Sequence, residues 1–194
     1  MSGTSTMPYP RTVSVLLLIF LGLLFAFTGA RLNVYDQLYP VFEWLETTPF
    51  GVIGKTWGAA FALVEALHLL AMAVLGGAVI VGDGRLLGVL FADRPLNEIN
   101  AQSDRAFNVA IVLMILTGVF MACGVALKVY FLDVFWYKML ALFVGLFFVF
   151  CIRRPLLKRG GDALPKSLQR LLAVASLMIW FSVAATGRWI GFSG

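Results

Sequence analysis

Long apolar runs separated by short polar segments dominate this chain from residue 12 onwards. Five runs approach or exceed the roughly 20 residues that a helix needs to cross the hydrocarbon core of a bilayer; they lie at about 12–30, 56–81, 106–128, 134–152 and 168–187. Lipid cannot satisfy backbone groups, so only helices or closed barrels cross it. The runs lack the alternation of barrel strands. The pattern therefore predicts an all-α, polytopic membrane helical bundle with five transmembrane helices.

The remaining segments divide the chain around these runs. Residues 1–11 form a polar tail, and the first transmembrane helix follows at 12–30. The end of that run, Thr28 to Ala30, resembles a signal-peptidase site, but we expect an uncleaved span. Residues 31–55 mix aromatic with acidic side chains, which is typical of short helices in the headgroup zone; a plain loop is the alternative. Residues 56–192 form the predicted four-helix membrane core.

Two prolines and one polar stretch give local boundaries. Pro40 and Pro49 are expected to interrupt helices in the interfacial segment, because proline ends helices at or before its own position. The polar residues at 93–104 are expected to form a short surface helix that leads into the third span. Cys123 and Cys151 are expected to lie towards opposite leaflets, so a disulfide between them is not predicted.

The composition supports the membrane class. Hydrophobic residues make up 61% of the chain and charged residues 13%, against about a quarter charged in soluble domains. The net charge of +5 concentrates in the loop between the last two spans, at Arg153, Arg154, Lys158, Arg159, Lys166 and Arg170. The positive-inside rule then places the N-terminus inside and the C-terminus outside a bacterial inner membrane. This basic balance indicates topology and attraction to membrane lipid, and no nucleic-acid partner is expected.

Glu65 and the chain's only histidine, His68, lie at membrane depth in the second span. Glu65 is about 13 Å below the outer end of its helix, and His68 is about one turn deeper. Residues three apart share a helix face, so Phe61, Glu65, His68 and Met72 are predicted to form one stripe. That stripe is expected to point into the bundle, because a carboxylate facing lipid costs several kcal/mol.

Cations on neighbouring spans are the expected partners of these groups. Lys138 begins the fourth span on the outer side and is the nearest candidate for an ion pair with Glu65, while Arg188 ends the fifth span on the same side. One interpretation is a structural ion pair. The other is a cofactor or ligand pocket, since ionisable groups inside membranes are functional candidates.

Haem b is the specific cofactor candidate for that pocket. His68 would be the axial ligand, and Arg188, Lys138 or Lys128 would neutralise the propionates. No second histidine is present, so the other axial position would need a methionine such as Met114, water or a partner chain. A simple metal ion is disfavoured, because one histidine and one glutamate give too few ligands for zinc.

At the inner end of the second span, Asp83 and Arg85 lie among glycines. We interpret them as a charged interfacial cap with a sharp turn. The sequence carries no Walker loop, no dinucleotide-binding glycine pattern, no Ser/His/Asp arrangement and no zinc-protease helix. No catalytic residues are therefore predicted.

Several short motifs carry a family resemblance. They are Trp44, Leu45, Glu46, Thr48 and Pro49; Glu65, Ala66, Leu67 and His68; Asp83, Arg85, Leu86, Leu87 and Gly88; Phe135, Trp136 and Lys138; and Gly187, Arg188, Trp189, Ile190 and Gly191. Over roughly 42–192 the chain resembles a family of small bacterial membrane proteins with a domain of unknown function. The resemblance implies a four-helix membrane core and no established activity. Members commonly have a further histidine where this chain has Cys151 and Arg153. A weaker similarity links the histidine helix to CopD-type copper-resistance membrane proteins.

Three functions are compatible with these features. The leading hypothesis is a non-catalytic accessory or anchoring subunit of a larger membrane complex, in contact with lipid and with other membrane chains or copies of itself. The alternative is a redox or ligand-binding subunit with a single b-type haem or quinone pocket in the outer half. The third is a small-solute or ion transporter.

Overall fold

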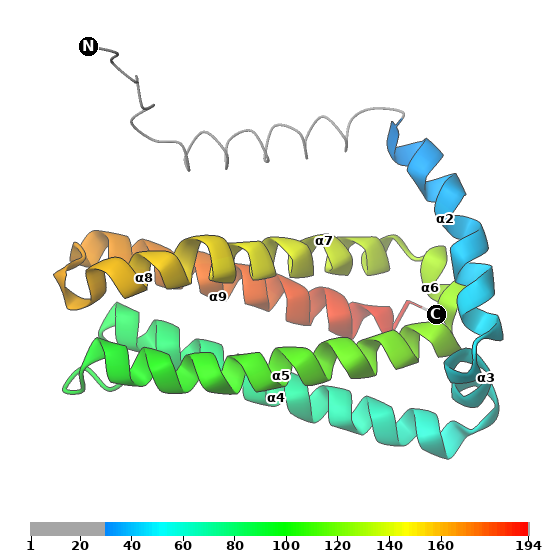
Figure 1. Ribbon diagram of the computed structural model, residues 1–194, viewed down its shortest axis with the longest axis horizontal. Helices are drawn as coiled ribbons and strands as arrows, with labels where there is room; N and C mark the ends of the chain where they lie inside the picture. Colours follow the sequence, from blue (N-terminus) through cyan, green and yellow to red (C-terminus); the bar gives the residue numbers. More distant parts are fainter. Residues whose placement is uncertain (1–29, 194) are drawn as a thin grey trace, which may run out of the picture. The chain divides into compact units, whose positions relative to one another are not determined.

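The computed structural model describes residues 30–193 (Figure 1). The polar tail at 1–11 and the predicted first span, except for Ala30, lie outside the described residues. The chain separates into two compact units, Met1–Val41 and Phe42–Gly194. The helical bundle belongs to the second unit, and its elements, like those of the rest of the described chain, are helical.

Four helical segments of the bundle are long and apolar enough to cross a membrane within the described part of the chain. They are α4 (Gly58–Leu87), α5 (Leu96–Gly124), the continuous run Asp133–Ala163, and α9 (Lys166–Ile190). The run Asp133–Ala163 comprises α7 (Asp133–Phe147), the π-helix η1 (Phe148–Arg153), α8 (Arg154–Gly160) and the 3-10 turn η2 (Gly161–Ala163). The prediction of an all-α fold with four core helices long and apolar enough to span a membrane is confirmed; the fifth span and the inside and outside assignment stay predictions.

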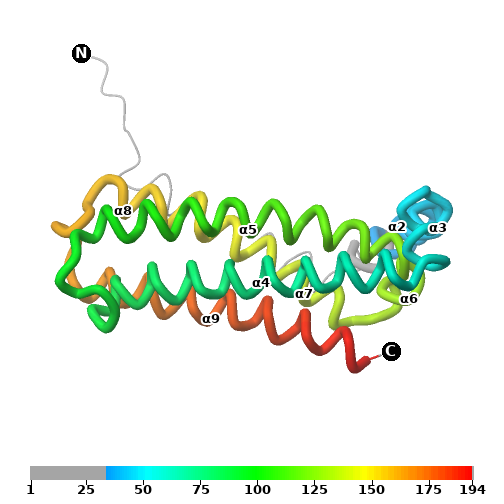
Figure 2. The backbone as a smooth tube through the Cα atoms, turned by 90° about the horizontal axis from the view of Figure 1, so that it is seen from below, coloured from blue at the N-terminus to red at the C-terminus, as the bar shows by residue number. Residues whose placement is uncertain are grey.

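Helix pairing follows chain order. α4 packs along α5, α7 packs along α9, and α4 also packs along α9; both views show these helices running side by side (Figures 1 and 2). The central core lies between them and includes Leu75, Phe107, Ile111, Met114 and Trp180. Outside this core, most of each span's surface is apolar and exposed, as expected of helices that face lipid.

Local backbone conformation and packing explain where α4 ends and where α5 begins. α4 ends at Gly88, which has φ +78° and so adopts the left-handed conformation that glycine tolerates. α5 begins after Pro95, and Leu96 is completely buried at its start. The polar stretch at 93–104 therefore does not form a separate surface helix. It supplies the first turns of α5, because its apolar residues pack against the bundle.

Two further helices precede the bundle spans. They are α2 (Ala30–Thr47) and α3 (Pro49–Thr56), so the helical interpretation of the interfacial segment is confirmed. The predicted interruption at Pro40 is wrong, because α2 continues through that residue. Pro49 does begin a new helix, where the Thr48 hydroxyl accepts a hydrogen bond from the Gly51 N–H at 3.2 Å.

Glu46 connects the end of α2 to the bundle. Its carboxylate forms an ion pair with Lys55 of α3 and accepts a 2.9 Å hydrogen bond from the Leu127 N–H at the start of α6 (Ala126–Tyr130). Nearby, Phe42 packs against Tyr130 and Trp136. At this end of the bundle Gly54 and Gly124 also touch, since a Cβ on Gly54 would lie 2.9 Å from the Gly124 Cα.

Candidate functional site

His68 lies on the buried face of α4. That face follows the spacing Val64, His68, Ala71 and Leu75, and His68 is only 9% exposed. Glu65 differs from the prediction, because its side chain is exposed rather than directed into the bundle. Residues three apart are separated by about 60° around a helix of 3.6 residues per turn. This 60° offset places Glu65 next to the buried face of α4 but not within it.

The His68 imidazole is held by α5. Its Nδ1 lies 2.8 Å from the Thr117 hydroxyl oxygen, and Thr117 donates its single hydroxyl proton to the Leu113 carbonyl at 2.6 Å. If Thr117 donates to Leu113, it accepts from His68 Nδ1, and the Nε2 of the imidazole keeps its lone pair. The ring lies over Gly118, whose added Cβ would be 3.3 Å from His68 Cε1. Gly118 thus permits this close approach.

The predicted partners do not join Glu65. No hydrogen bond or ion pair links Glu65 to Lys138, or to any other residue in the part of the chain that the structure describes. Lys138 is half-buried, lies beside Gly187, and is close enough to act electrostatically on His68. Arg188 stacks over Phe192 at 4.4 Å. Among residues 30–193, the four predicted site residues thus form no common hydrogen-bonded or ion-paired cluster, and only Lys138 acts electrostatically on His68.

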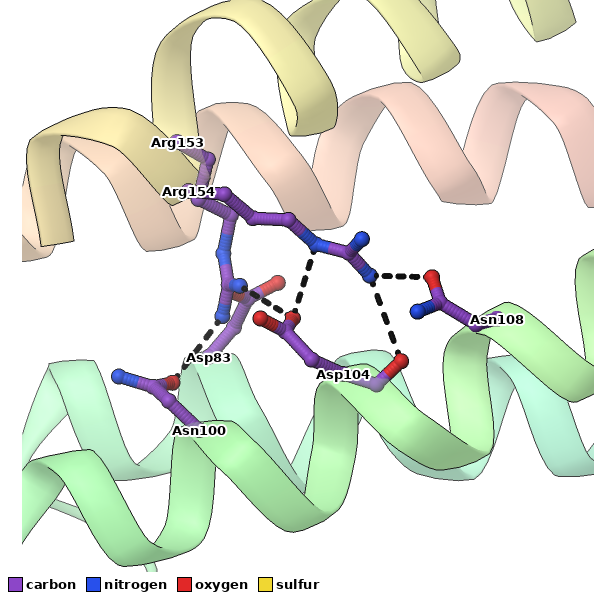
Figure 3. A network of polar contacts seen from close by, with 6 residues as sticks. All are labelled: Asp83, Asn100, Asp104, Asn108, Arg153 and Arg154. Carbon is purple, nitrogen blue, oxygen red and sulfur yellow. Dashed lines mark hydrogen bonds and ion pairs between the residues drawn. The ribbon is translucent and has the colours of Figure 1, made fainter. Parts of the chain in front are cut away.

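A separate polar cluster occupies the half of the bundle that contains the turn between α4 and α5, called the inner half below after the predicted topology (Figure 3). Asp83 is completely buried, and Arg153 of η1 is only 5% exposed. Arg153 binds Asp83 Oδ1 through Nη2 at 2.9 Å and through Nε at 3.0 Å. The same guanidinium lies 3.7 Å from Asp104 Oδ1 and 3.5 Å from Asn100 Oδ1, both on α5. One arginine therefore joins three helical segments.

Arg154 extends this inner cluster along α5. Its Nε lies 3.1 Å from Asp104 Oδ1, and its Nη2 donates to Asn108 Oδ1 at 2.8 Å (Figure 3). The guanidinium carbon stacks 4.5 Å from the Phe150 ring and 5.3 Å from the Phe107 ring. The adjacent π-helix is a type of distortion that often marks functional positions.

The predicted interfacial cap of Asp83 and Arg85 needs correction. Asp83 is inside the bundle and paired with Arg153, so it does not cap the helix end. Arg85 does serve the turn, since its Nε donates to the Arg94 carbonyl at 2.8 Å and its Nη2 lies 3.8 Å from Asp162. The polar pair Asn100 and Asp104, four residues apart on α5, was the sequence signal for this cluster.

The described residues provide few side chains that could bind a metal ion or a cofactor. No group of three or more histidine, cysteine or acidic side chains with metal-binding geometry occurs among them. An apolar groove of about 460 Å³ lies between α4, α5 and α9 and is lined by residues that include Met72, Gly76, Met114, Leu177 and Ala184. His68 does not line it. The chain contains a single histidine, so it has no pair of histidines for the two axial positions of a haem.

This architecture defines a small, all-helical, multi-pass membrane protein. A family model matches residues 41–193, and its description is a family of unknown function, DUF6644. The chain belongs to that family, and the predicted resemblance is confirmed. No match was found among curated proteins or among solved structures. The comparisons give no support to the weaker similarity to CopD-type copper-resistance proteins.

Proposed function

We propose that this protein is an accessory subunit of a bacterial inner-membrane complex, and that it binds another membrane chain through the surface of α4 that carries Glu65. The observation that carries the proposal is Glu65. It is an exposed carboxylate on a membrane-spanning helix, and no hydrogen bond or ion pair to it occurs within the described residues. The proposal contains no catalytic step.

The position of Glu65 makes solvation by water alone a poor explanation. It lies seven residues after the first residue of α4, Gly58, which corresponds to about 10 Å along the helix. An acidic side chain costs about 2.5 to 3.5 kcal/mol at the centre of a spanning helix and less towards its ends, so the cost at Glu65 is below that range. Exposed apolar residues flank it, including Leu63 and Leu67. A partner chain that supplies a hydrogen-bond donor would remove this cost.

The surface around Glu65 suits close contact with another helix. Five small residues on α4 are exposed with it: Ala59, Ala62, Ala66, Ala73 and Gly77. A Cβ added at Gly77 would meet no atom within 4 Å. Small residues let helix backbones approach closely in membranes, where packing and hydrogen bonds drive association. This surface, Glu65 with the five small residues, is called the α4 outer surface below.

The carboxylate also indicates what the partner presents. A second copy docked symmetrically through α4 would place two Glu65 carboxylates near each other, which disfavours ionisation of both. A different chain that carries an amide, hydroxyl or basic side chain at the same depth would pair with Glu65 directly. We therefore expect a hetero-complex rather than a symmetric dimer.

The test is purification of the tagged full-length chain from its native membrane after mild extraction. We expect the wild type to elute with a second membrane chain, and the Glu65→Leu variant to elute without it. Phe181→Leu is the matched control, because Phe181 is 75% exposed and belongs to a different helix, α9. A wild-type chain that elutes as a clean monomer would contradict the proposal.

One observation favours a second function, that of a redox subunit. The Thr117 hydrogen bond orients His68 so that Nε2 keeps its lone pair, as second-shell partners do for metal-binding histidines. If this is the function, haem added to the purified protein gives a Soret band that sharpens with dithionite and is lost in His68→Ala. The absence of any such band removes this alternative and leaves the accessory-subunit proposal intact.

A further inference from the structure

A small cavity lies inside the inner polar cluster, between α4, α5, η1 and α9. Its volume is about 10 Å³, and its polar lining includes Asp83, Ser103, Arg153, Ser176 and Trp180. Such a volume corresponds to about one water-sized sphere. The cavity is therefore large enough for a single water molecule and too small for an organic ligand.

Three residues that line this cavity each carry a buried polar atom without a hydrogen bond of normal geometry within the described residues, although the Ser176 hydroxyl lies near enough to the Asp83 carboxylate to interact with it. The three atoms are Asp83 Oδ2, Ser103 Oγ and the indole Nε1 of Trp180. All three side chains are more than nine-tenths buried. An unpaired buried polar group costs about 1–3 kcal/mol, and native proteins satisfy such groups in the great majority of cases. Three of them on one cavity indicate a shared ligand.

The net charge of the cluster indicates whether that ligand is charged or neutral. Two arginines, Arg153 and Arg154, are matched by two aspartates, Asp83 and Asp104. A bound cation or anion would leave this buried group with a net charge, which is costly away from water. The unpaired atoms comprise one donor, one acceptor and one hydroxyl that can act as either. A neutral ligand with both donors and acceptors fits these requirements.

We propose that the cavity binds one ordered water molecule. The water accepts a hydrogen bond from Trp180 Nε1, donates one to Asp83 Oδ2, and exchanges one with the Ser103 hydroxyl. Buried waters typically make about three such bonds. Trp180 belongs to α9, Asp83 to α4 and Ser103 to α5. Because Arg153 ties η1 to the same aspartate, the water completes a polar connection between all four spans.

The direct test is a crystal structure in a lipidic mesophase at a resolution that shows ordered water. We expect one density peak within hydrogen-bond distance of Asp83 Oδ2, Ser103 Oγ and Trp180 Nε1. The Trp180→Phe variant should lose the peak, because it removes the indole N–H that donates to the water. Trp189→Phe makes the same substitution at an exposed tryptophan and should keep it.

A second measurement reports on the folded wild type in solution. In protein labelled with nitrogen-15 tryptophan, the Trp180 indole N–H should show cross-relaxation with water despite its burial. The Trp180→Phe spectrum assigns that resonance. The proposal would be overturned if the Trp180 indole N–H showed no cross-relaxation with water. It would also be overturned by a direct Ser103 to Asp83 hydrogen bond without density between them, or by a density peak that persists in Trp180→Phe.

Discussion

Charged groups are paired with one another in the inner half of the bundle, whereas two charged groups of the outer half have no partner among the described residues. In the inner half, Arg153 and Arg154 bind Asp83 and Asp104, so the charges cancel within the chain. In the outer half, the carboxylate of Glu65 and the ammonium of Lys138 have no such bonds among the described residues. Ionisable groups are costly in both halves, so the difference lies in where their partners come from.

This contrast distinguishes polar groups that hold the bundle together from a polar group that is available to another chain. The inner cluster joins α4, α5 and η1 at a charge-neutral site, and its contacts are complete enough to specify how these helices pack. The α4 outer surface adds little to the packing of its own chain. We therefore interpret the inner cluster as structural and the α4 outer surface as the place where the protein meets another chain.

The largest expected effect comes from breaking the buried ion pair. Arg153→Ala should lower the free energy of unfolding by about 3–5 kcal/mol, because it leaves the buried Asp83 carboxylate without its main partner. Thermal or denaturant unfolding in detergent measures this loss. Lys158→Ala, at an exposed cation nearby, should change stability by less than about 0.5 kcal/mol. Equal effects of the two variants would contradict a structural role for the inner cluster.

A smaller effect is expected at the His68 hydrogen bond. Thr117→Val should cost about 1–3 kcal/mol, because the buried Nδ1–H of His68 loses its acceptor. Thr186→Val is the matched control, since the Thr186 hydroxyl bonds only carbonyls of its own helix. Nitrogen-15 shifts of His68 report the tautomer in the same samples. An Nδ1 that carries no proton in the wild type would show that the assigned donor is wrong.

The smallest effect on stability is expected at Glu46, outside the spans. Burial raises the pKa of this carboxyl, but the bonds from Lys55 and the Leu127 N–H outweigh it and hold the pKa below its ordinary value of 4.5. A lowered folded-state pKa stabilises the protein above the unfolded-state pKa, and this contribution is lost as pH falls through the folded value. The pair should contribute less than about 1 kcal/mol.

The pH dependence of unfolding checks this contribution. Glu46→Gln should remove the part of the stability loss that the wild type shows as the pH falls below about 4. Glu43→Gln, at an exposed position on the same helix, should retain it. An unchanged pH profile in Glu46→Gln would mean that this carboxylate does not connect α2 to the bundle.

Much of the fold follows from the sequence because the bilayer imposes simple requirements. Four spans were predicted from apolar runs, but α4 and the run Asp133–Ala163 continue about six and eleven residues beyond the predicted ends at 81 and 152. Three of the four starts lie within two residues of the prediction; the exception is α5, which begins at Leu96 rather than near residue 106. That start depends on burial of Leu96 and Ile99 against other helices. The polarity of residues 93–104 alone does not predict this packing.

The candidate site was harder to predict, for reasons visible in particular residues. Asp83 and Arg153 are 70 positions apart, and Arg153 belongs to a basic run that the positive-inside rule already explains. Whether Glu65 faces in or out depends on about 60° of helix rotation, which the stripe of Phe61, His68 and Met72 did not resolve. His68 was predicted to be buried, but its bond to Thr117 requires knowledge of how α4 and α5 align.

The central claim is that the α4 outer surface contacts another membrane chain, and site-specific photo-crosslinking in native membranes tests it most directly. A photoreactive residue replaces Ala66, next to Glu65, or Phe181 on the exposed face of α9. We predict a protein adduct of a distinct second chain from position 66, lost when Glu65→Leu is added, and only lipid adducts from position 181. Lipid adducts alone from position 66 would contradict the account.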